Sequence, residues 1–192
     1  MALALALAGG CDGGGGGSEG PGAPPGRFVA VTADPVDEAS LEDLCETSAT
    51  AGDARAFALP ALDGPAPAAA SGWRWVNVWA TWCRPCIEEM PMLVEWTSRL
   101  GREGKNVELL FLSADSTAEA VAEFRREHTD VPESARVADA TALPEWVTRV
   151  GLDSGATLPI HVFVDPAGRT RCARTGAVGE DDYGAVARLL GE

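Results

Sequence analysis

The chain has 192 residues, of which 46% are apolar and 23% charged. This is the composition of an ordinary globular domain, and it excludes a wholly disordered, collagen-like or polytopic membrane chain. The 29 acidic and 15 basic side chains leave a formal net charge of -14, so the chain would repel a phosphate backbone and we expect no binding to nucleic acid. Its five cysteines are too few for a disulfide-dense miniprotein, and their spacing must indicate their role.

Residues 1–10 have the pattern of an export signal. They alternate Ala and Leu and end on two glycines immediately before Cys11. A run this short cannot span a bilayer, which needs about 20 apolar residues as a helix. Small residues leading into a cysteine resemble the lipobox of bacterial lipoproteins, in which that cysteine is lipidated. We therefore predict a lipoprotein signal over residues 1–10 and a lipid anchor at Cys11. An ordinary signal peptide with an incidental cysteine is the alternative.

Two further segments precede the first strong structural pattern. Residues 12–26 are mostly glycine and proline, and their largest other apolar side chain is alanine; this composition predicts a flexible tether, which we place over residues 11–26. Residues 27–56 are rich in Asp and Glu, which indicates a solvated, acidic lead-in with one short helix near residues 39–46. The pattern changes at residue 57, and we place one domain over residues 57–192.

A strand, a helix and a second strand open this domain. Residues 73–80 combine aromatic and β-branched side chains, as in a strand buried on both faces. Apolar residues at helical spacing follow over residues 86–100, interrupted by Pro91. A second apolar run at residues 107–113 completes a βαβ unit, which imposes parallel strands.

The rest of the chain alternates helices with strands of a different kind. A helix should follow Ser116 or Thr117 as its N-cap and end near residue 127. Strands at residues 160–164 and 170–175 are joined by a strong hairpin signal. Other expected elements are a short segment at 135–138 and helices at 143–150 and 180–190. The sequence thus predicts an α/β fold with a central mixed β-sheet, parallel at its start and antiparallel at its end, flanked by helices on both faces.

Cys83-Arg84-Pro85-Cys86 lies where the first predicted strand meets the first predicted helix. A C-x-x-C motif in this context is typical of thioredoxin-like redox sites, because two intervening residues let the sulfurs reach bonding distance. The helix dipole and the charge of Arg84 should lower the pKa of Cys83 below that of a free thiol. We predict that Cys83 is the nucleophile and that Cys86, shielded by the helix, resolves the mixed disulfide.

Residues 77–91 read Asn-Val-Trp-Ala-Thr-Trp-Cys-Arg-Pro-Cys-Ile-Glu-Glu-Met-Pro. This stretch resembles the active-site region of TlpA/ResA-like, membrane-tethered thiol-disulfide oxidoreductases of the thioredoxin superfamily. The resemblance extends from about residue 57 to the C-terminus and implies a thioredoxin-like fold. It also implies that Pro159 is cis and faces the disulfide, with the backbone of Leu158 offered to an extended substrate.

The predicted substrate surface surrounds an exposed Cys83 sulfur. Trp82 should form part of a flat apolar surface there, together with Arg84 and Pro85. The other tryptophans are expected in the core: Trp73, Trp75, Trp79, Trp96 and Trp146.

The resemblance also suggests a group that handles the proton of Cys86. Thioredoxin itself has a buried acid six positions before its first active-site cysteine, but this chain has Asn77 there. The ResA-like branch instead carries a glutamate three residues past the second cysteine, which matches Glu89 and places it on the same side of the helix as Cys86. We assign Glu89 to proton handling. From spacing alone, a solvated carboxylate like Glu88 is the alternative.

Three polar or thiol side chains remain outside this motif. His161 lies in a predicted strand next to Pro159, and a lone strand histidine is more often structural than catalytic. Cys45 and Cys172 are predicted to form a structural disulfide, because thiols in exported proteins usually pair. The alternative is two unrelated buried thiols.

We expect an extracytoplasmic, membrane-anchored thiol-disulfide oxidoreductase that acts as a protein disulfide reductase, with no cofactor beyond its own Cys83–Cys86 disulfide. Its partners would be disulfide-containing exported proteins and, as the resemblance implies, a membrane electron donor that keeps it reduced. We expect a monomer. The alternative function is a Cu(I)- or Zn-binding module without redox turnover, but the remaining Cys and His residues form no second close ligand pair and we predict no metal site.

Overall fold

The structure is a computed structural model, and it describes residues 40–192. The predicted signal, the tether, the anchor at Cys11 and the lead-in up to residue 39 lie outside the described residues. Within the described part, no helix combines the length and apolar character needed to cross a membrane.

A seven-stranded mixed sheet forms the centre of the fold, in the order β1-β7-β6-β3-β4-β5, with β2 also paired to β7. The strands are β1 (Thr47–Ser48), β2 (Arg55–Ala56), β3 (Trp73–Trp79), β4 (Val107–Ser113), β5 (Ser134–Arg136), β6 (Ile160–Val164) and β7 (Arg169–Thr175). The β3, β4 and β5 strands pair in parallel. The β6 strand pairs antiparallel with β3 on one side and with β7 on the other. The predicted thioredoxin-like α/β fold, with its parallel start and antiparallel end, is confirmed.

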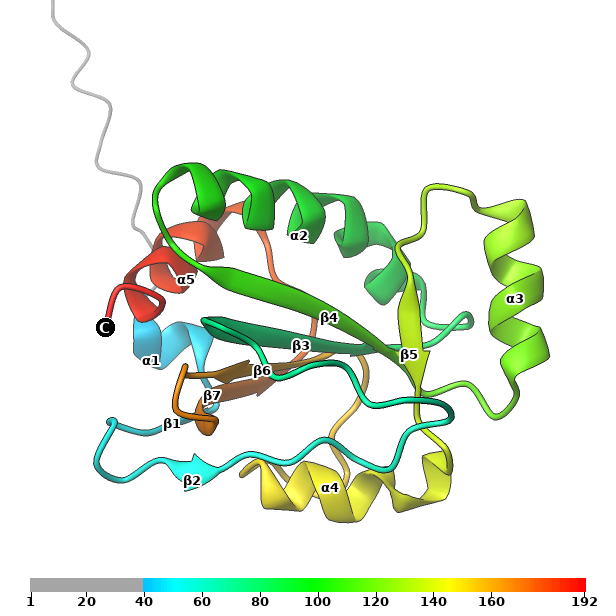
Figure 1. Ribbon diagram of the computed structural model, residues 1–192, viewed down its shortest axis with the longest axis horizontal. Coiled ribbons are helices and arrows are strands. Elements are labelled where there is room, and N and C mark those ends of the chain that lie inside the picture. Colours follow the sequence, from blue (N-terminus) through cyan, green and yellow to red (C-terminus); the bar gives the residue numbers. More distant parts are fainter. Residues whose placement is uncertain (1–39) are drawn as a thin grey trace, which may run out of the picture. The chain divides into compact units, whose positions relative to one another are not determined.

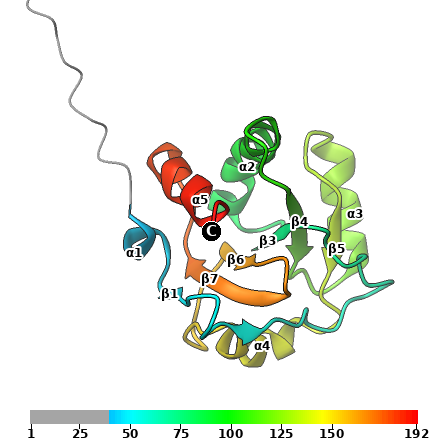
Figure 2. The ribbon, with the colours of Figure 1, turned by 60° about the vertical axis from the view of Figure 1, so that its left-hand side comes forward.

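Helices lie on both faces of this sheet (Figure 1). In the rotated view, α2 and α5 lie on one side of the strands, α4 lies on the other, and α3 stands beside β5 (Figure 2). The helices are α1 (Leu41–Leu44), α2 (Arg84–Arg102), α3 (Ala118–Glu127), α4 (Leu143–Arg149) and α5 (Tyr183–Leu189), with short 3-10 turns η1 (Ala140–Ala142) and η2 (Glu180–Asp182). Thr117 caps α3 by accepting a hydrogen bond from the backbone of Ala120, as predicted.

The α2 helix continues through Pro91, the residue that interrupts the apolar period of the predicted helix. Pro91 lies inside a continuous helix of 19 residues. Proline removes one backbone hydrogen bond from a helix interior. The neighbouring Met90 and Leu93 are buried in the core, and their packing holds the helix together across this position.

Alternate side chains of β3 supply two separate apolar cores. Trp75 and Trp79 belong to the cluster that includes the buried residues of α2 and α5, whereas Val76 and Val78 pack with those of α4. All seven β3 residues are buried, as expected for a central strand covered on both faces. The five tryptophans expected in the core are buried, and Trp82 is 71% exposed.

The acidic lead-in is not simply solvated, and this corrects both its predicted character and the predicted domain start at residue 57. Leu44 is completely buried in the same core cluster as α5. The β1 strand pairs with β7, with Thr47 opposite Ala173. The charged residues Glu42 and Asp43 face solvent, so an acidic composition concealed a segment that belongs to the sheet.

Aromatic contacts join the end of α2 to α5. The ring of Tyr183 packs edge-on against Trp96, with 5.2 Å between ring centroids, and its hydroxyl donates a hydrogen bond of 2.9 Å to Glu103. Burial and this hydrogen bond raise the pKa of Tyr183 to about 12. The α2 helix is thus fixed at its C-terminal end, away from the cysteines at its N-terminus.

Candidate active site

Cys83 and Cys86 form a disulfide at the beginning of α2, with 5.3 Å between their Cα atoms. Cys83 is the N-cap residue, and its backbone N–H donates to Ala80, just past the end of β3. Pro85 lies in the first turn, where backbone N–H groups have no acceptor within the helix, so the missing N–H of proline costs no hydrogen bond. The C-terminal end of β3 and the start of α2 therefore hold the two cysteines together.

The two sulfur-bearing residues differ in access to solvent. Cys86 is fully buried, and Cys83 keeps 5% of its surface exposed. Cys83 is therefore less exposed than the sequence predicted, because it packs into the same apolar cluster as Cys86. Trp82, Arg84 and Pro85 are exposed, so the disulfide lies under a rim of accessible side chains.

Arg84 does not present a free positive charge to Cys83. Its Nε donates to Glu88 at 2.7 Å, and this hydrogen bond raises the pKa of Arg84. Both side chains are largely exposed. The contribution of Arg84 to a Cys83 thiolate is therefore weaker than the sequence suggested. The N-terminus of α2 still favours a negative charge on Cys83. The first turn of α2 contains no acidic residue that would oppose this effect.

Pro159 lies at the edge of the sheet where β3 leads to the cysteines. The Leu158–Pro159 peptide bond is cis, and β6 begins immediately after it. The β6 strand pairs with β3, and Ile160 lies opposite Val78, one residue before the end of β3. Strand pairing thus brings Leu158 and Pro159 to the same end of the sheet as the C-x-x-C motif.

Glu89 is buried, with only 4% of its surface exposed. Its Oε1 accepts a hydrogen bond of 2.8 Å from Asn77 Nδ2, and its Oε2 accepts one of 3.0 Å from the backbone N–H of Val178. The alternative of a solvated carboxylate is therefore wrong for Glu89, although it describes the exposed Glu88. Glu89 and Cys86 are three residues apart on the buried face of α2.

His161 joins this cluster, which sequence reasoning missed. It is fully buried on β6, and its Nε2 lies 3.4 Å from Glu89 Oε1. On the other side of the ring, Trp75 Nε1 donates a hydrogen bond of 3.1 Å to Nδ1. The available signal was the occurrence of two polar residues, Asn77 and His161, in strands that are otherwise largely apolar.

The chain is similar in sequence to curated proteins that are named for thiol-disulfide exchange. The chain is 34% identical over 113 residues to a protein named thiol:disulfide interchange protein DsbE homolog from Paracoccus denitrificans, covering 58% of this chain and 55% of that protein. It is 30% identical over 94 residues to the thiol-disulfide oxidoreductase ResA of Bacillus cereus, covering 49% of each. The chain is a homologue of the DsbE and ResA thiol-disulfide oxidoreductases.

The similarity to these DsbE and ResA homologues covers about half the length of each. No family model matches the chain. Among solved structures, a thioredoxin-related protein from Neisseria meningitidis serogroup B is 28% identical with a TM-score of 0.49, over 62% of this chain and 84% of that one.

A second disulfide joins Cys45 to Cys172, the two cysteines predicted to pair. Their Cα atoms are 5.4 Å apart, and both residues are buried. Cys45 directly follows α1, and Cys172 lies in β7. This bridge ties the lead-in to the antiparallel edge of the sheet and is separate from the C-x-x-C motif.

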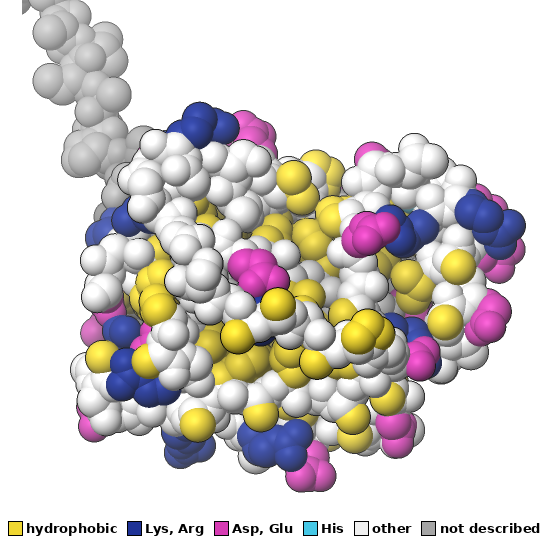
Figure 3. Space-filling model, viewed as in Figure 1, with side chains coloured by type: hydrophobic (Ala, Val, Ile, Leu, Met, Phe, Trp, Pro, Cys, Tyr) yellow, Lys and Arg dark blue, Asp and Glu magenta, His cyan; other side chains and the backbone are white. Residues whose placement is uncertain are grey.

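The described residues contain no group of three or more His, Cys, Asp or Glu side chains arranged to hold a metal ion. His128, which directly follows α3, stacks on Phe124. On the face shown in Figure 3, acidic and basic side chains are interspersed, and neither sign forms a continuous patch.

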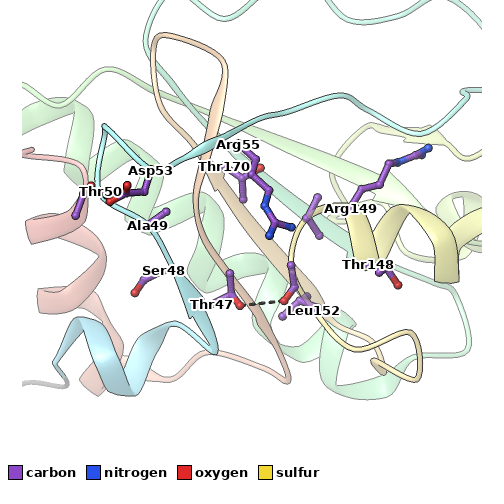
Figure 4. Close-up of a pocket in the computed structure, with 12 residues that line it drawn as sticks. Thr47, Ser48, Ala49, Thr50, Asp53, Arg55, Thr148, Arg149, Leu152 and Thr170 are labelled. Atoms are coloured by element: carbon purple, nitrogen blue, oxygen red, sulfur yellow. Dashed lines mark hydrogen bonds between the residues drawn. The ribbon is translucent and has the colours of Figure 1, made fainter.

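A pocket of about 580 Å³ opens between the lead-in strands and the end of α4 (Figure 4). Its lining includes Thr47, Asp53, Arg55, Arg149 and Thr170. A hydrogen bond of 2.9 Å from Thr47 Oγ1 to the Gly151 carbonyl crosses its edge. None of the residues predicted for the redox site lines this pocket, so it is distinct from the cysteine site.

Proposed function

We propose that the chain is an extracytoplasmic thiol-disulfide oxidoreductase that reduces disulfides in exported proteins. One observation carries this proposal: a disulfide at a helix N-terminus, in which Cys83 retains a solvent-accessible edge and Cys86 is fully buried. A thiolate is favoured at a helix N-terminus, where backbone N–H groups and the helix dipole stabilise negative charge.

The reaction begins from the reduced pair. The Cys83 thiolate attacks one sulfur of the substrate disulfide, and the other substrate sulfur leaves as a thiolate. Cys86 then loses its proton and attacks Cys83 in the mixed disulfide, which releases the second substrate thiolate and forms the Cys83–Cys86 disulfide. Two electrons pass from the pair to the substrate, and the released thiolates take protons from solvent.

Glu89 accepts the Cys86 proton in this proposal. Both groups lie on the buried face of α2, where water is excluded, so the thiol needs a base within the protein. The hydrogen bonds from Asn77 and Val178 fix the carboxylate in place.

The substrate would bind across the rim formed by Trp82, Arg84, Pro85, Leu158 and Pro159. The exposed Trp82 offers apolar contact area beside Cys83. Among the described residues, none forms a hydrogen bond with the backbone of Leu158. An extended substrate segment can therefore pair with Leu158 as an added strand would.

Features outside this site support the proposed location. The Cys45–Cys172 bridge suits an oxidising compartment, where structural disulfides persist. The export-like residues 1–10, the lipobox-like approach to Cys11 and the glycine-rich tether fit a domain held at a membrane surface. We propose that a membrane electron donor returns the Cys83–Cys86 pair to the dithiol state, and that no cofactor beyond this pair is needed.

Insulin reduction tests the proposed activity. The chain, supplied with dithiothreitol, is expected to accelerate the precipitation of insulin B chains over dithiothreitol alone, since each reduced pair opens an insulin disulfide and is then reduced again. Precipitation at the rate of dithiothreitol alone would contradict a disulfide reductase.

A further inference from the structure

We propose that His161 is a positioning residue for the resolving step: as a neutral imidazole it directs its Nε2–H at Glu89 and holds that carboxylate ready to accept the Cys86 proton. This inference rests on the proposed function, because it concerns the second half of the exchange reaction. It adds a residue from β6 to chemistry so far assigned to α2.

The neighbours of His161 determine which ring nitrogen carries the proton. The indole N–H of Trp75 can only donate, and it lies 3.1 Å from Nδ1. The amide nitrogen of Asn77 is 3.5 Å from the same atom. Nδ1 is therefore an acceptor, and the single proton of the neutral ring lies on Nε2.

The Nε2 of His161 forms no hydrogen bond, although the carboxylate of Glu89 lies close to it. The nitrogen is buried and without a hydrogen-bond partner, and Glu89 Oε1 lies 3.4 Å away. Leaving a buried N–H unpaired is costly, and catalytic hydrogen bonds often tighten only as the reaction proceeds. We infer that this contact shortens when Glu89 acts, so that His161, Asn77 and the Val178 backbone together orient the carboxylate.

The same geometry prevents His161 from serving as the base itself. A second proton would have to occupy Nδ1, where the Trp75 N–H already points. The proton therefore passes from the Cys86 thiol to Glu89 as the Cys86 sulfur bonds to Cys83 and the substrate thiolate departs. Glu89 later returns the proton to solvent, and His161 neither gains nor loses one.

Besides Glu89 and His161, the ionisable groups to consider at this cluster are Cys86, Arg174 and Asp182. Cys86 lies on the same buried face of α2 as Glu89. Arg174 lies directly opposite His161 on β7, and directly opposed residues project from the same face of a sheet. Its Nη1 is 3.5 Å from Asp182 Oδ2 in η2, so its charge already has a partner. Any change in the pH dependence of the resolving step must be interpreted against Arg174 and Asp182 as well as Glu89.

The two halves of the exchange can be separated with the aromatic disulfide DTNB. The full chain is reduced only at Cys83 and Cys86, and excess reductant is removed. Attack by Cys83 releases a first thionitrobenzoate, and resolution by Cys86 releases a second. Stopped-flow absorbance follows both phases across a range of pH, and the Cys86→Ala variant identifies the first phase because it cannot produce the second.

His161→Leu is expected to slow the second phase by about 10-fold or more and to change its pH profile, while the first phase is unchanged. Glu89→Gln should slow the second phase at least as much. His161→Gln keeps a side-chain N–H donor and should recover part of the rate. His128→Leu, which replaces the exposed histidine of the segment after α3, is the matched control and should behave as wild type.

A second phase in His161→Leu with the wild-type rate and pH profile would overturn the assignment. Absence of the first phase in wild type would overturn the proposed function itself, and the positioning role with it. If the His161→Leu variant fails to fold, the position of the His161 proton in the wild-type protein is measured by nitrogen NMR. A neutral ring with its proton on Nε2 supports the proposal, and a proton on Nδ1 refutes it.

Discussion

Replacing Cys83 by serine is expected to lower the rate of catalysed insulin reduction by about 10³-fold or more, because a serine hydroxyl is not ionised at neutral pH and cannot form a disulfide. Replacing Cys86 by alanine should abolish turnover to a similar extent but for a different reason. Cys83 can still attack, whereas the mixed disulfide has no neighbouring thiol to resolve it. Turnover is measured from insulin precipitation with each variant.

The two variants should differ in what remains bound to the protein. Cys86→Ala is expected to accumulate a covalent adduct with an insulin chain, visible by mass spectrometry without reductant, and Cys83→Ser is expected to form none. This difference follows from burial, since Cys86 has no exposed surface and Cys83 retains an accessible edge. An adduct on Cys86 in the Cys83→Ser protein, formed at the rate seen in Cys86→Ala, would reverse the assignment of nucleophile and resolving residue.

Reducing the Cys45–Cys172 bridge is expected to lower the free energy of unfolding by about 5 kcal/mol on the chain-entropy model of disulfide stabilisation. The effect is large because the bridge joins residues 127 positions apart, and opening so long a loop increases the freedom of the unfolded chain. Urea unfolding with and without reductant measures it. A Cys83→Ser/Cys86→Ser background leaves this bridge as the only described disulfide that the reductant can open.

The matched control for that experiment removes the bridge by substitution. In the same background, Cys45→Ala/Cys172→Ala should unfold at the urea concentration of the reduced protein and should not respond to reductant. Equal stability with the bridge open and closed would contradict a stabilising role for this disulfide.

Much of the fold follows from local patterns in the sequence. The strands at residues 107–113 and 160–164 have the predicted boundaries, because a strand buried between helices leaves an almost continuous apolar run. The C-x-x-C motif also locates the site from a local pattern, because two intervening residues at a helix start bring the sulfurs within bonding distance. Composition mispredicts the lead-in because its charges outnumber the few residues that bind it to the fold, among which Leu44 is buried in the core and Cys45 forms the bridge to Cys172.

The environment of Glu89 could not be predicted in the same way. Helical spacing places Glu89 on the side of Cys86, but its burial depends on the β6 strand and the Val178 segment, which are distant in sequence. The contact with His161 depends on strand register, which places Asn77 directly opposite His161. A shift of one residue would turn His161 to the other face of the sheet, and no local signal determines that register.

Reversible opening of the Cys83–Cys86 disulfide in the folded chain can be followed by equilibration in glutathione buffers of increasing reducing power. Thiols are then trapped by alkylation and assigned to peptides by mass spectrometry. We predict that Cys83 and Cys86 become alkylated together in one two-electron transition, while Cys45 and Cys172 stay joined and the protein stays folded. A Cys83–Cys86 bond that opens only when the chain unfolds, or only together with the Cys45–Cys172 bridge, would contradict a redox role for this pair.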